Sequence, residues 1–359
     1  MPPSTQTAQR STELPNVYRP SPYRALLFVS LFALLTACGP QKEIHRIQGQ
    51  VFGTAVEISI YGESPERARV LGALVLNEFN RLHDKYHAWR PSELTALNDH
   101  IAHGERYQGD AEMVYLLKSA TALAEHSGNT FNPAIGHLIR LWGFQSDRAT
   151  AHEPAPADIK RWVDANPRMT DLRYDGTVIW STNNALMLDF GGWVKGYALD
   201  QAARILRDEG VEAALINVGG NILAIGQPGE RPWRVGIQDP RHEGTIAQLD
   251  LHDSEAIGTS GDYRRYFMQE GKRRAHIIDP RSGETVDLVA SVTIITAGGD
   301  DAGLRSDGYS KPLFIVGPAH WRDMAQQLGL ADVMLIDIAG NAHMTPSMQV
   351  RMNAQPAAQ

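Results

Sequence analysis

The chain has 359 residues, a formal net charge of −7, 43% hydrophobic residues and one cysteine. This length and hydrophobic content are typical of a globular protein with a sizeable core, in one large domain or two. The acidic balance argues against a nucleic-acid-binding protein, because such proteins carry basic surfaces. A single cysteine excludes an internal disulfide and a metal centre built from cysteines.

The only cysteine, Cys38, directly follows an apolar run from Ala25 to Ala37. The run is too short to span a bilayer, follows several arginines and ends in small residues, as an export signal does. A cysteine in this position resembles the lipobox of bacterial lipoproteins. The resemblance implies a signal peptide over residues 1–37, a lipid-bearing Cys38 and a periplasmic protein anchored to a membrane. The alternative is a buried structural cysteine beside a membrane-anchor helix.

Removal of residues 1–37, which carry a net charge of +2, leaves a mature chain of net charge −9. Such a chain has no thiol besides Cys38, which excludes a catalytic cysteine. Residues 38–48 are polar and are predicted to form a tether, and residues 353–359 a disordered tail. The folded domain is therefore expected over residues 49–352.

Hydrophobic periodicity predicts a mixed α/β fold, of the α+β type, without regular βαβ repetition. Alternation predicts a strand at 56–60, and helical spacing predicts helices at 68–82 and 111–126. Residues 147–167 are rich in alanine, proline and charge, which indicates a surface excursion with a short helix. The elements expected after it are a strand at 185–188, a helix at 197–209 and strands at 214–218, 233–237, 275–278, 291–296 and 333–336.

The segment from Asp189 to Tyr197 carries the strongest chemical signal, because it follows a predicted strand and opens a predicted helix. Paired glycines allow the backbone to approach a ligand, while the helix amides and the Lys195 ammonium would converge on an anion. It is not a Walker loop, and no Gly-x-Gly-x-x-Gly follows a predicted strand. A tight structural turn is the alternative interpretation.

Other polar segments lie near predicted strands. Residues 258–266 combine hydroxyls, a carboxylate and arginines, and residues 276–280 place a histidine before a proline turn. His83 and His87 have zinc-compatible spacing but no third ligand nearby, which favours a structural role. Ser260 is not in a Gly-x-Ser-x-Gly elbow, which argues against a serine hydrolase.

Taken in order, the segments 189–197, 259–266, 276–280 and 307–317 resemble those of the ApbE family of FAD:protein FMN transferases. The resemblance covers residues 50–337 and implies a single domain with mixed sheets flanked by helices. It implies an enzyme that transfers FMN from FAD to a Ser or Thr hydroxyl and releases AMP. The acceptors it implies are flavoprotein subunits of the sodium-translocating NADH:quinone reductase or of Rnf-type complexes.

The resemblance also assigns residues to the FAD site. Phe52 would contact the flavin, and Trp89, where relatives have tyrosine, would stack on the isoalloxazine ring. Asn132 stands where relatives have aspartate, which keeps an acceptor and loses a charge. The FAD-binding positions implied beyond Phe52 and Trp89 are Thr130, Phe131, Asn132, Gly191, Gly192, Lys195, Tyr197, Thr259, Ser260, Gly261, Asp262, His276, Ile277 and Lys311.

The family's magnesium site is altered in this chain. Relatives use an aspartate, a threonine four residues later and a backbone carbonyl, which correspond here to Asp307, Lys311 and Val194. A charged ammonium cannot ligate a metal, so Lys311 is expected to replace part of the magnesium charge. The alternative is a plain helix pair between Asp307 and Lys311, which Pro312 disfavours.

Two residues are candidate bases for the attacking hydroxyl. Asp307 is favoured, because a carboxylate near the phosphates can hold a cation and accept a proton; His276 is the second candidate. Two other functions stay open: a metal-dependent FAD pyrophosphatase with water as the nucleophile, and a flavin-binding lipoprotein without turnover.

Overall fold

In the computed structural model, residues 4, 42–145 and 153–353 are described. Cys38, the predicted signal peptide apart from Ser4, and residues 354–359 of the predicted tail lie outside these ranges. The described residues from Glu43 onward form one compact unit.

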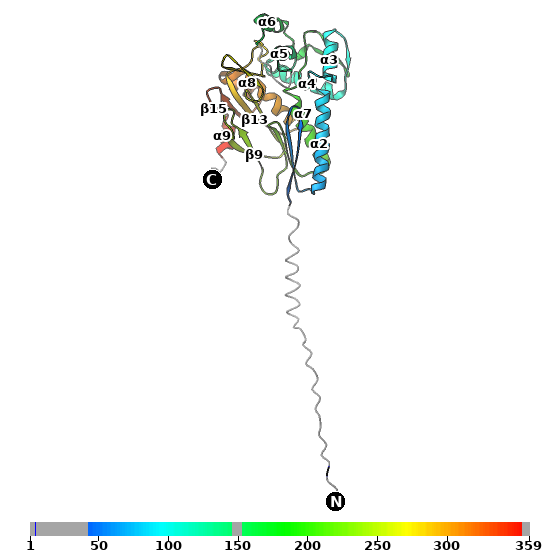
Figure 1. Ribbon diagram of the computed structural model, residues 1–359, viewed down its shortest axis with the longest axis vertical. Coiled ribbons are helices and arrows are strands. Elements are labelled where there is room, and N and C mark those ends of the chain that lie inside the picture. The colour runs from blue at the N-terminus through cyan, green and yellow to red at the C-terminus, as the bar shows by residue number, and fades with distance from the viewer. Residues whose placement is uncertain (1–3, 5–41, 146–152, 354–359) are drawn as a thin grey trace. The chain divides into compact units, whose positions relative to one another are not determined.

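The unit is built on an eight-stranded sheet in which every pair of neighbouring strands in the described residues is antiparallel (Figure 1). Its strands, in spatial order, are β1 (Ile44–Val51), β2 (Thr54–Tyr61), β6 (Ala213–Val218), β7 (Asn221–Ile225), β10 (Glu255–Gly261), β13 (Val289–Ala297), β14 (Asp332–Asp337) and β15 (Ala342–Met344).

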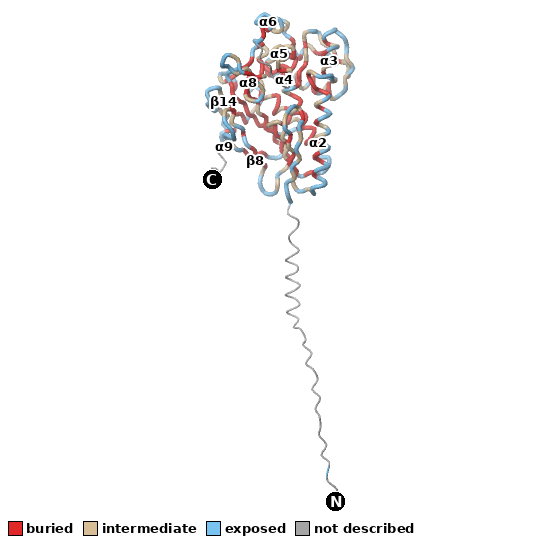
Figure 2. The backbone as a smooth tube through the Cα atoms, in the orientation of Figure 1, coloured by how far each residue is buried: buried red, intermediate tan, exposed pale blue. Residues whose placement is uncertain are grey.

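Both faces of this sheet are covered, so its central strands are buried on both sides (Figure 2). In β13, Ile294 belongs to one apolar core and its neighbour Ile295 to another, because successive side chains point to opposite faces. Helices cover the first face, and a hairpin with a terminal helix covers the second. These elements are α2 (Pro65–Lys85), α7 (Val194–Asp208) and α8 (Ala302–Gln327), then β8 (Trp233–Gln238), β9 (Thr245–Leu251) and α9 (Pro346–Asn353).

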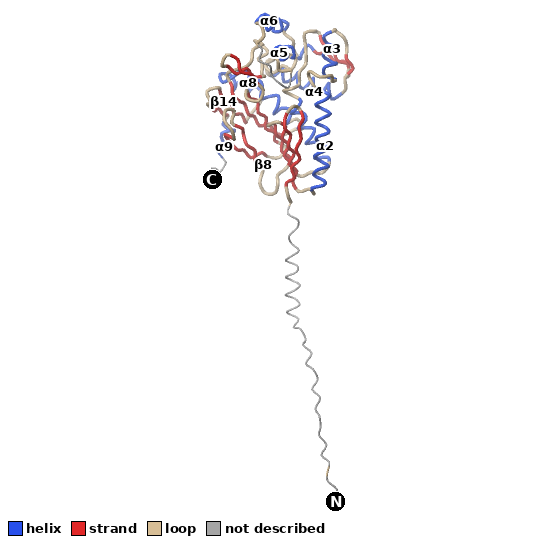
Figure 3. Tube along the Cα trace, viewed as in Figure 1, coloured by secondary structure: helices blue, strands red, loops and turns tan. Residues whose placement is uncertain are grey.

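The remaining elements lie at the end of the unit opposite the start of β1 (Figures 1 and 3). A third apolar core, with Trp142, Phe144 and Phe267, holds part of this end together. The elements are α3 (Glu93–Ala102), β3 (Tyr107–Gln108), α4 (Ala111–His126), α5 (Gly136–Leu141), α6 (Pro156–Ala165), the 3-10 helix η1 (Met169–Asp171), β4 (Leu172–Asp175), β5 (Val178–Ser181), β11 (Tyr266–Gln269) and β12 (Lys272–Ala275).

The predicted α/β class is confirmed, and so are most predicted elements. The helices α2, α4 and α7 and the strands β2, β6, β8, β13 and β14 lie where periodicity placed them, although α7 begins three residues earlier. The short helix predicted within residues 147–167 is α6; residues 147–152 lie outside the described ranges.

Three of the predicted segments differ in the structure. Residues 38–48 are not all tether, because β1 begins at Ile44; its polar residues face solvent at the sheet edge. Residues 185–188 form only one bridge, since the Asn98 side chain takes the hydrogen bonds of the Leu188 backbone in place of a neighbouring strand. The strand predicted at 275–278 instead ends as β12 at Ala275.

Candidate functional site

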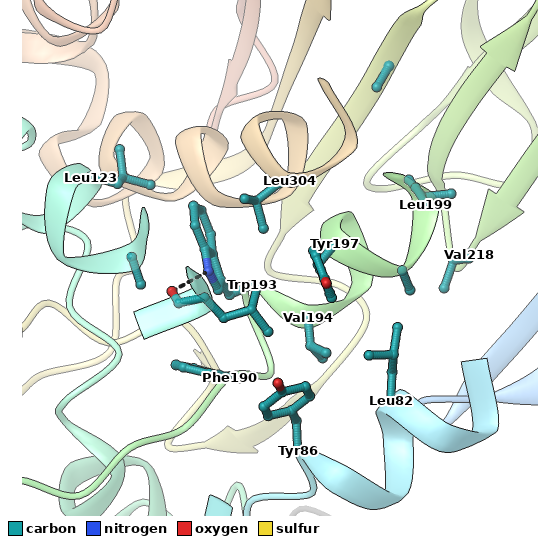
Figure 4. Close-up of a cluster of buried hydrophobic side chains, with 14 of the residues drawn as sticks. Leu82, Tyr86, Leu123, Phe190, Trp193, Val194, Tyr197, Leu199, Val218 and Leu304 are labelled. Atoms are coloured by element: carbon teal, nitrogen blue, oxygen red, sulfur yellow. Dashed lines mark hydrogen bonds between the residues drawn. The ribbon is translucent and has the colours of Figure 1, made fainter. Parts of the chain in front are cut away.

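The helices α7 and α8 cross at glycines, which brings their backbones close together. A Cβ on Gly196 would lie 2.4 Å from the Gly303 carbonyl oxygen and 2.7 Å from the Asp307 Cβ. The missing side chain lets Asp307 reach the start of α7, where its Oδ2 accepts a hydrogen bond from the Gly196 N–H at 3.1 Å. Figure 4 shows the start of α7, with Trp193, beside α8.

Two lysines surround the Asp307 carboxylate. Lys311 Nζ, one helical turn later on α8, donates to Asp307 Oδ1 at 2.7 Å and to its backbone oxygen at 2.6 Å. Lys195 Nζ lies 3.9 Å from Asp307 Oδ2 and donates to the Gly191 oxygen at 2.6 Å. Asp307 is 2% exposed, whereas the Lys311 and Lys195 side chains keep 18% and 25% of their surface.

The charges of this trio favour an anion. Burial alone would raise the pKa of Asp307, but the Lys195 and Lys311 ammonium groups lower it to about 2. Burial lowers the pKa of Lys311, and the Asp307 carboxylate opposes this shift. With both lysines protonated, the two lysines and one carboxylate leave a net positive charge at the start of α7, where the helix dipole is also positive. An anionic ligand such as a phosphate is stabilised by both contributions.

Asp189, which the sequence did not single out as a site residue, lies in the same loop. Its Oδ1 accepts from the Gly191 N–H at 2.8 Å, while Oδ2 is buried and has no hydrogen-bond partner among the described residues. Burial raises the pKa of Asp189. A buried polar atom without a partner is costly, so Oδ2 is suited to a ligand donor. The signal in the sequence that could have identified Asp189 as a site residue is its position at the end of an apolar run, two residues before paired glycines.

His276 lies close enough to the lysines for their charges to act on it. Its Nδ1 is 3.1 Å from the Arg265 carbonyl oxygen, which can only accept, so Nδ1 carries the proton and Nε2 presents a lone pair. Burial lowers the pKa of His276 to about 3, with further repulsion from Arg265, Lys195 and Lys311. The imidazole is therefore neutral at physiological pH.

Trp89 and Phe52 stand at the two ends of a row of rings. Trp89 packs edge-on to His87 at 4.8 Å, His87 to His83 at 5.0 Å, and His83 to Phe52 at 5.6 Å between ring centroids. The Arg265 guanidinium lies 5.6 Å from the Trp89 ring, and the backbone carbonyl of the same residue accepts from His276, so Arg265 connects this row to His276. Among the described residues no group of three metal-ligating side chains occurs, so the two histidines are ring partners here.

The predicted segment 130–132 packs against the loop that precedes α7. The Thr130 hydroxyl donates to the Ser127 oxygen, and the Phe131 ring packs on Trp193 at 5.2 Å. The Asn132 side chain donates to the Pro167 oxygen and accepts from a nearby backbone N–H. These polar groups are satisfied within the protein, so the segment supports the loop that precedes α7.

The polar group of Tyr197 also has a partner within the protein. Its ring is buried next to the start of α7 (Figure 4), and its hydroxyl donates to Glu112 of α4 at 3.2 Å. Its side chain therefore connects α7 to α4.

The predicted turn at 259–262 consists of the last three residues of β10 and Asp262, which follows the strand. The Thr259 hydroxyl pairs with a threonine of β13, and the Asp262 carboxylate binds Arg241 and Arg273 at 2.7 and 3.2 Å. Ser260 is closer to the lysines, because its hydroxyl lies 2.7 Å from that of Ser310, the residue before Lys311. The two remaining predicted FAD residues of this region, Gly261 and Ile277, are buried.

The described residues do not fit a magnesium ion. Asp307 Oδ1 accepts from Lys311, and Oδ2 accepts from Gly196. Val194 is the first residue of α7, where its carbonyl points along the helix. The Asp307–Lys311 pair is helical, so the expectation from Pro312 was wrong: α8 continues past it and is interrupted only at Gly317 (φ 73°).

Comparisons with known proteins show the family of this chain. The sequence model of the ApbE family matches residues 52–335. The chain belongs to the ApbE family. A relative from Rhodobacter capsulatus named FAD:protein FMN transferase is 36% identical over 304 residues, which cover 85% of this chain and 57% of that protein. The chain therefore spans little more than half of that relative's length.

Solved structures of ApbE family proteins share the fold. The ApbE protein of Thermotoga maritima matches with a TM-score of 0.78 and 29% identity, over 86% of this chain and 99% of that chain. The flavinyl transferase ApbE of Pseudomonas stutzeri, in its apo form, matches with a TM-score of 0.76 and 27% identity, over 88% and 99%. The resemblance seen in the sequence is confirmed.

Proposed function

We propose that this chain is an FAD:protein FMN transferase, which moves FMN from FAD to a Ser or Thr hydroxyl of a protein acceptor and releases AMP. The observation that carries the proposal is the pair of ammonium groups, Lys195 and Lys311, on Asp307 beside the Gly191–Gly192 loop. Two cations at a helix start suit a diphosphate, which is the part of FAD that must be cleaved. The names of the relatives support the same reaction.

The reaction makes one bond and breaks one bond at phosphorus. The acceptor hydroxyl oxygen attacks the phosphorus next to riboflavin, and the bond from that phosphorus to the bridging oxygen breaks. The electron pair leaves with AMP, so negative charge grows on the bridging oxygen. Lys195 and Lys311 stabilise this charge, which is the main demand of phosphoryl transfer.

The hydroxyl proton goes to His276 in this scheme. Both Asp307 oxygens already accept hydrogen bonds from protein donors, Gly196 and Lys311. His276 instead presents the Nε2 lone pair. The geometry thus favours His276 over Asp307, the candidate preferred from the sequence.

The flavin ring is assigned to the surface between Trp89 and Phe52. Trp89 is partly exposed, and an indole offers a flat apolar face to an isoalloxazine ring. Asp189 Oδ2 supplies a buried acceptor in the loop that contains Gly191 and Gly192. No step of the scheme passes through a magnesium ion, because the described residues do not fit one.

The cellular setting completes the proposal. The apolar run before Cys38 supports a lipid anchor in the periplasm, and flavoprotein subunits of the sodium-translocating NADH:quinone reductase or of Rnf-type complexes are the proposed acceptors. In the described ranges, no helix is long and apolar enough to cross a membrane.

Product analysis tests the proposed function. The full chain is incubated with FAD, Mg²⁺ and an acceptor subunit of the sodium-translocating reductase; the acceptor is then weighed by mass spectrometry and the nucleotides are separated. FMN bound to the acceptor with an equal amount of AMP supports the transferase. Free FMN with AMP indicates a pyrophosphatase, and intact FAD indicates a binding protein; either result contradicts it.

A further inference from the structure

We infer that the Lys311 ammonium is the built-in cation of this site, which stabilises the leaving phosphate and lets transfer proceed without a divalent metal. This inference rests on the proposed function and names the group that performs its electrostatic step. It concerns a position where the chain has an ammonium in place of a neutral metal ligand.

Lys311 Nζ is held in a fixed position with one donor to spare. Two of its three N–H groups are used by Asp307, at 2.6 Å to the backbone oxygen and 2.7 Å to Oδ1. No other hydrogen bond to Nζ occurs among the described residues, and 18% of the side chain is exposed. A fixed ammonium with a spare donor can bind a phosphate oxygen with little further ordering.

The stem of Lys311 lies directly against the glycine loop. A Cβ on Gly192 would be 2.4 Å from Lys311 Cε, which shows how closely the side chain packs on this residue. Lys195 is bound to the neighbouring Gly191 oxygen. The two ammonium groups therefore flank the loop where the helix amides also favour an anion.

The same contacts make a divalent ion unfavourable. Lys311 neutralises the Asp307 carboxylate, which is the acidic group a metal would need, and Lys195 lies 3.9 Å from its second oxygen. A dication placed there would meet two positive charges at short range in a buried setting, where like charges repel strongly. Lys311 therefore disfavours a divalent ion at this position and supplies positive charge in its place.

The first test measures binding, independently of turnover. FAD and riboflavin are titrated into the full chain in EDTA, followed by flavin fluorescence, for the parent, Lys311→Met and the control Lys160→Met. Lys160 is exposed on α6 and pairs only with Asp164 among the described residues. We expect about tenfold weaker FAD binding for Lys311→Met alone, with riboflavin binding unchanged, since riboflavin has no phosphate. Equal FAD affinity in parent and Lys311→Met overturns the inference.

The second test measures metal dependence. The parent should transfer FMN in EDTA at a rate close to its rate in Mg²⁺, whereas Lys311→Thr should need added Mg²⁺, because it frees Asp307 and supplies an oxygen ligand. A parent rate that vanishes in EDTA and returns with Mg²⁺ contradicts the inference. A parent that makes no FMN ester in either condition contradicts the proposed function instead.

A third variant displaces the Lys311 side chain through a substitution in the glycine loop that it packs against. Gly192→Ala should push the lysine stem away without removing its charge, because the new methyl would overlap Cε. It should weaken FAD binding as Lys311→Met does, with thermal unfolding measured to confirm folding. Parent-like FAD affinity in a folded Gly192→Ala protein would count against a fixed Lys311.

Discussion

Asp200 on α7 and Asp307 on α8 each cap the helix that carries the other. Asp200 accepts from the Gly303 and Leu304 N–H groups at the start of α8, at 2.7 and 2.8 Å, and Asp307 accepts from the Gly196 N–H at the start of α7. Neither helix start is capped by the side chain of its own N-cap residue. The two acidic side chains thus fix the position of α7 relative to α8, and with it the position of the two lysines.

Replacement of Asp200 tests this arrangement. Asp200→Ala leaves two buried N–H groups without an acceptor, so the free energy of unfolding should fall by about 1–3 kcal/mol. Asp208→Ala, at an exposed position on the same helix, is the matched control and should cause no such loss. Urea denaturation measures both variants. Equal stabilities would show that the Asp200 cap contributes nothing.

The pH dependence of the reaction tests the state of His276. Its pKa is lowered to about 3, so the free enzyme has no His276 titration near 6.5, and kcat/KM for FAD should show no inflection there. His276→Gln should keep FAD binding and lose transfer by a factor of about 10² or more. An inflection near pH 6.5 that disappears in His276→Gln would contradict a neutral imidazole.

The same lowered pKa has a consequence for stability. Between pH 6.5 and about 3 the unfolded chain binds a proton at His276 that the folded chain does not, so stability falls as pH falls through this range. In His276→Gln this part of the decline should be absent. The control His103→Gln, at an exposed position, should follow the parent. Denaturation at a series of pH values gives the slopes.

Trp89 should contribute to flavin binding through stacking. Trp89→Ala should weaken FAD binding by about 1–3 kcal/mol, the size of base stacking on an aromatic side chain, and Trp89→Phe should lose less. Trp180→Ala is the control, because that ring lies on β5 against Arg106. Fluorescence titration measures each affinity. If Trp89→Ala binds FAD like the control, the ring is only a packing residue.

The lipid anchor is tested in cells. Cys38→Ser should abolish lipid labelling and release the protein from membranes, since the thiol is the only site for the lipid. Fractionation with labelled fatty acid measures both effects. A variant that stays in the membrane fraction through an uncleaved 25–37 segment would contradict the lipoprotein interpretation.

The sequence predicted elements whose periodicity is strong and local. The helices α2 and α4 have apolar residues at helical spacing, and β13 is a short apolar run. No helix was predicted over the range of α8, and Pro312 was expected to bias Lys311 away from helical geometry. The buried Leu313 and Phe314 hold the helix in place there, which only tertiary packing reveals.

The candidate site was predicted in part for similar reasons. The motif from Asp189 to Tyr197 located Lys195, and the family pattern located Asp307 and Lys311. The mutual capping by Asp200 and Asp307 was not predictable, because each contact joins residues about a hundred positions apart. The predicted roles of residues 130–132 depended on which way their side chains point, which a sequence does not specify.

A structure of the chain with FAD bound, solved in the absence of divalent ions, tests the central claim most directly. The measured quantities are the distances from Lys195 Nζ and Lys311 Nζ to the diphosphate oxygens. The account predicts that both ammonium groups lie within hydrogen-bonding distance of the diphosphate, beside the Gly191–Gly192 loop. A diphosphate bound elsewhere, or one whose oxygens lie beyond hydrogen-bonding distance of Lys311 Nζ, would contradict it.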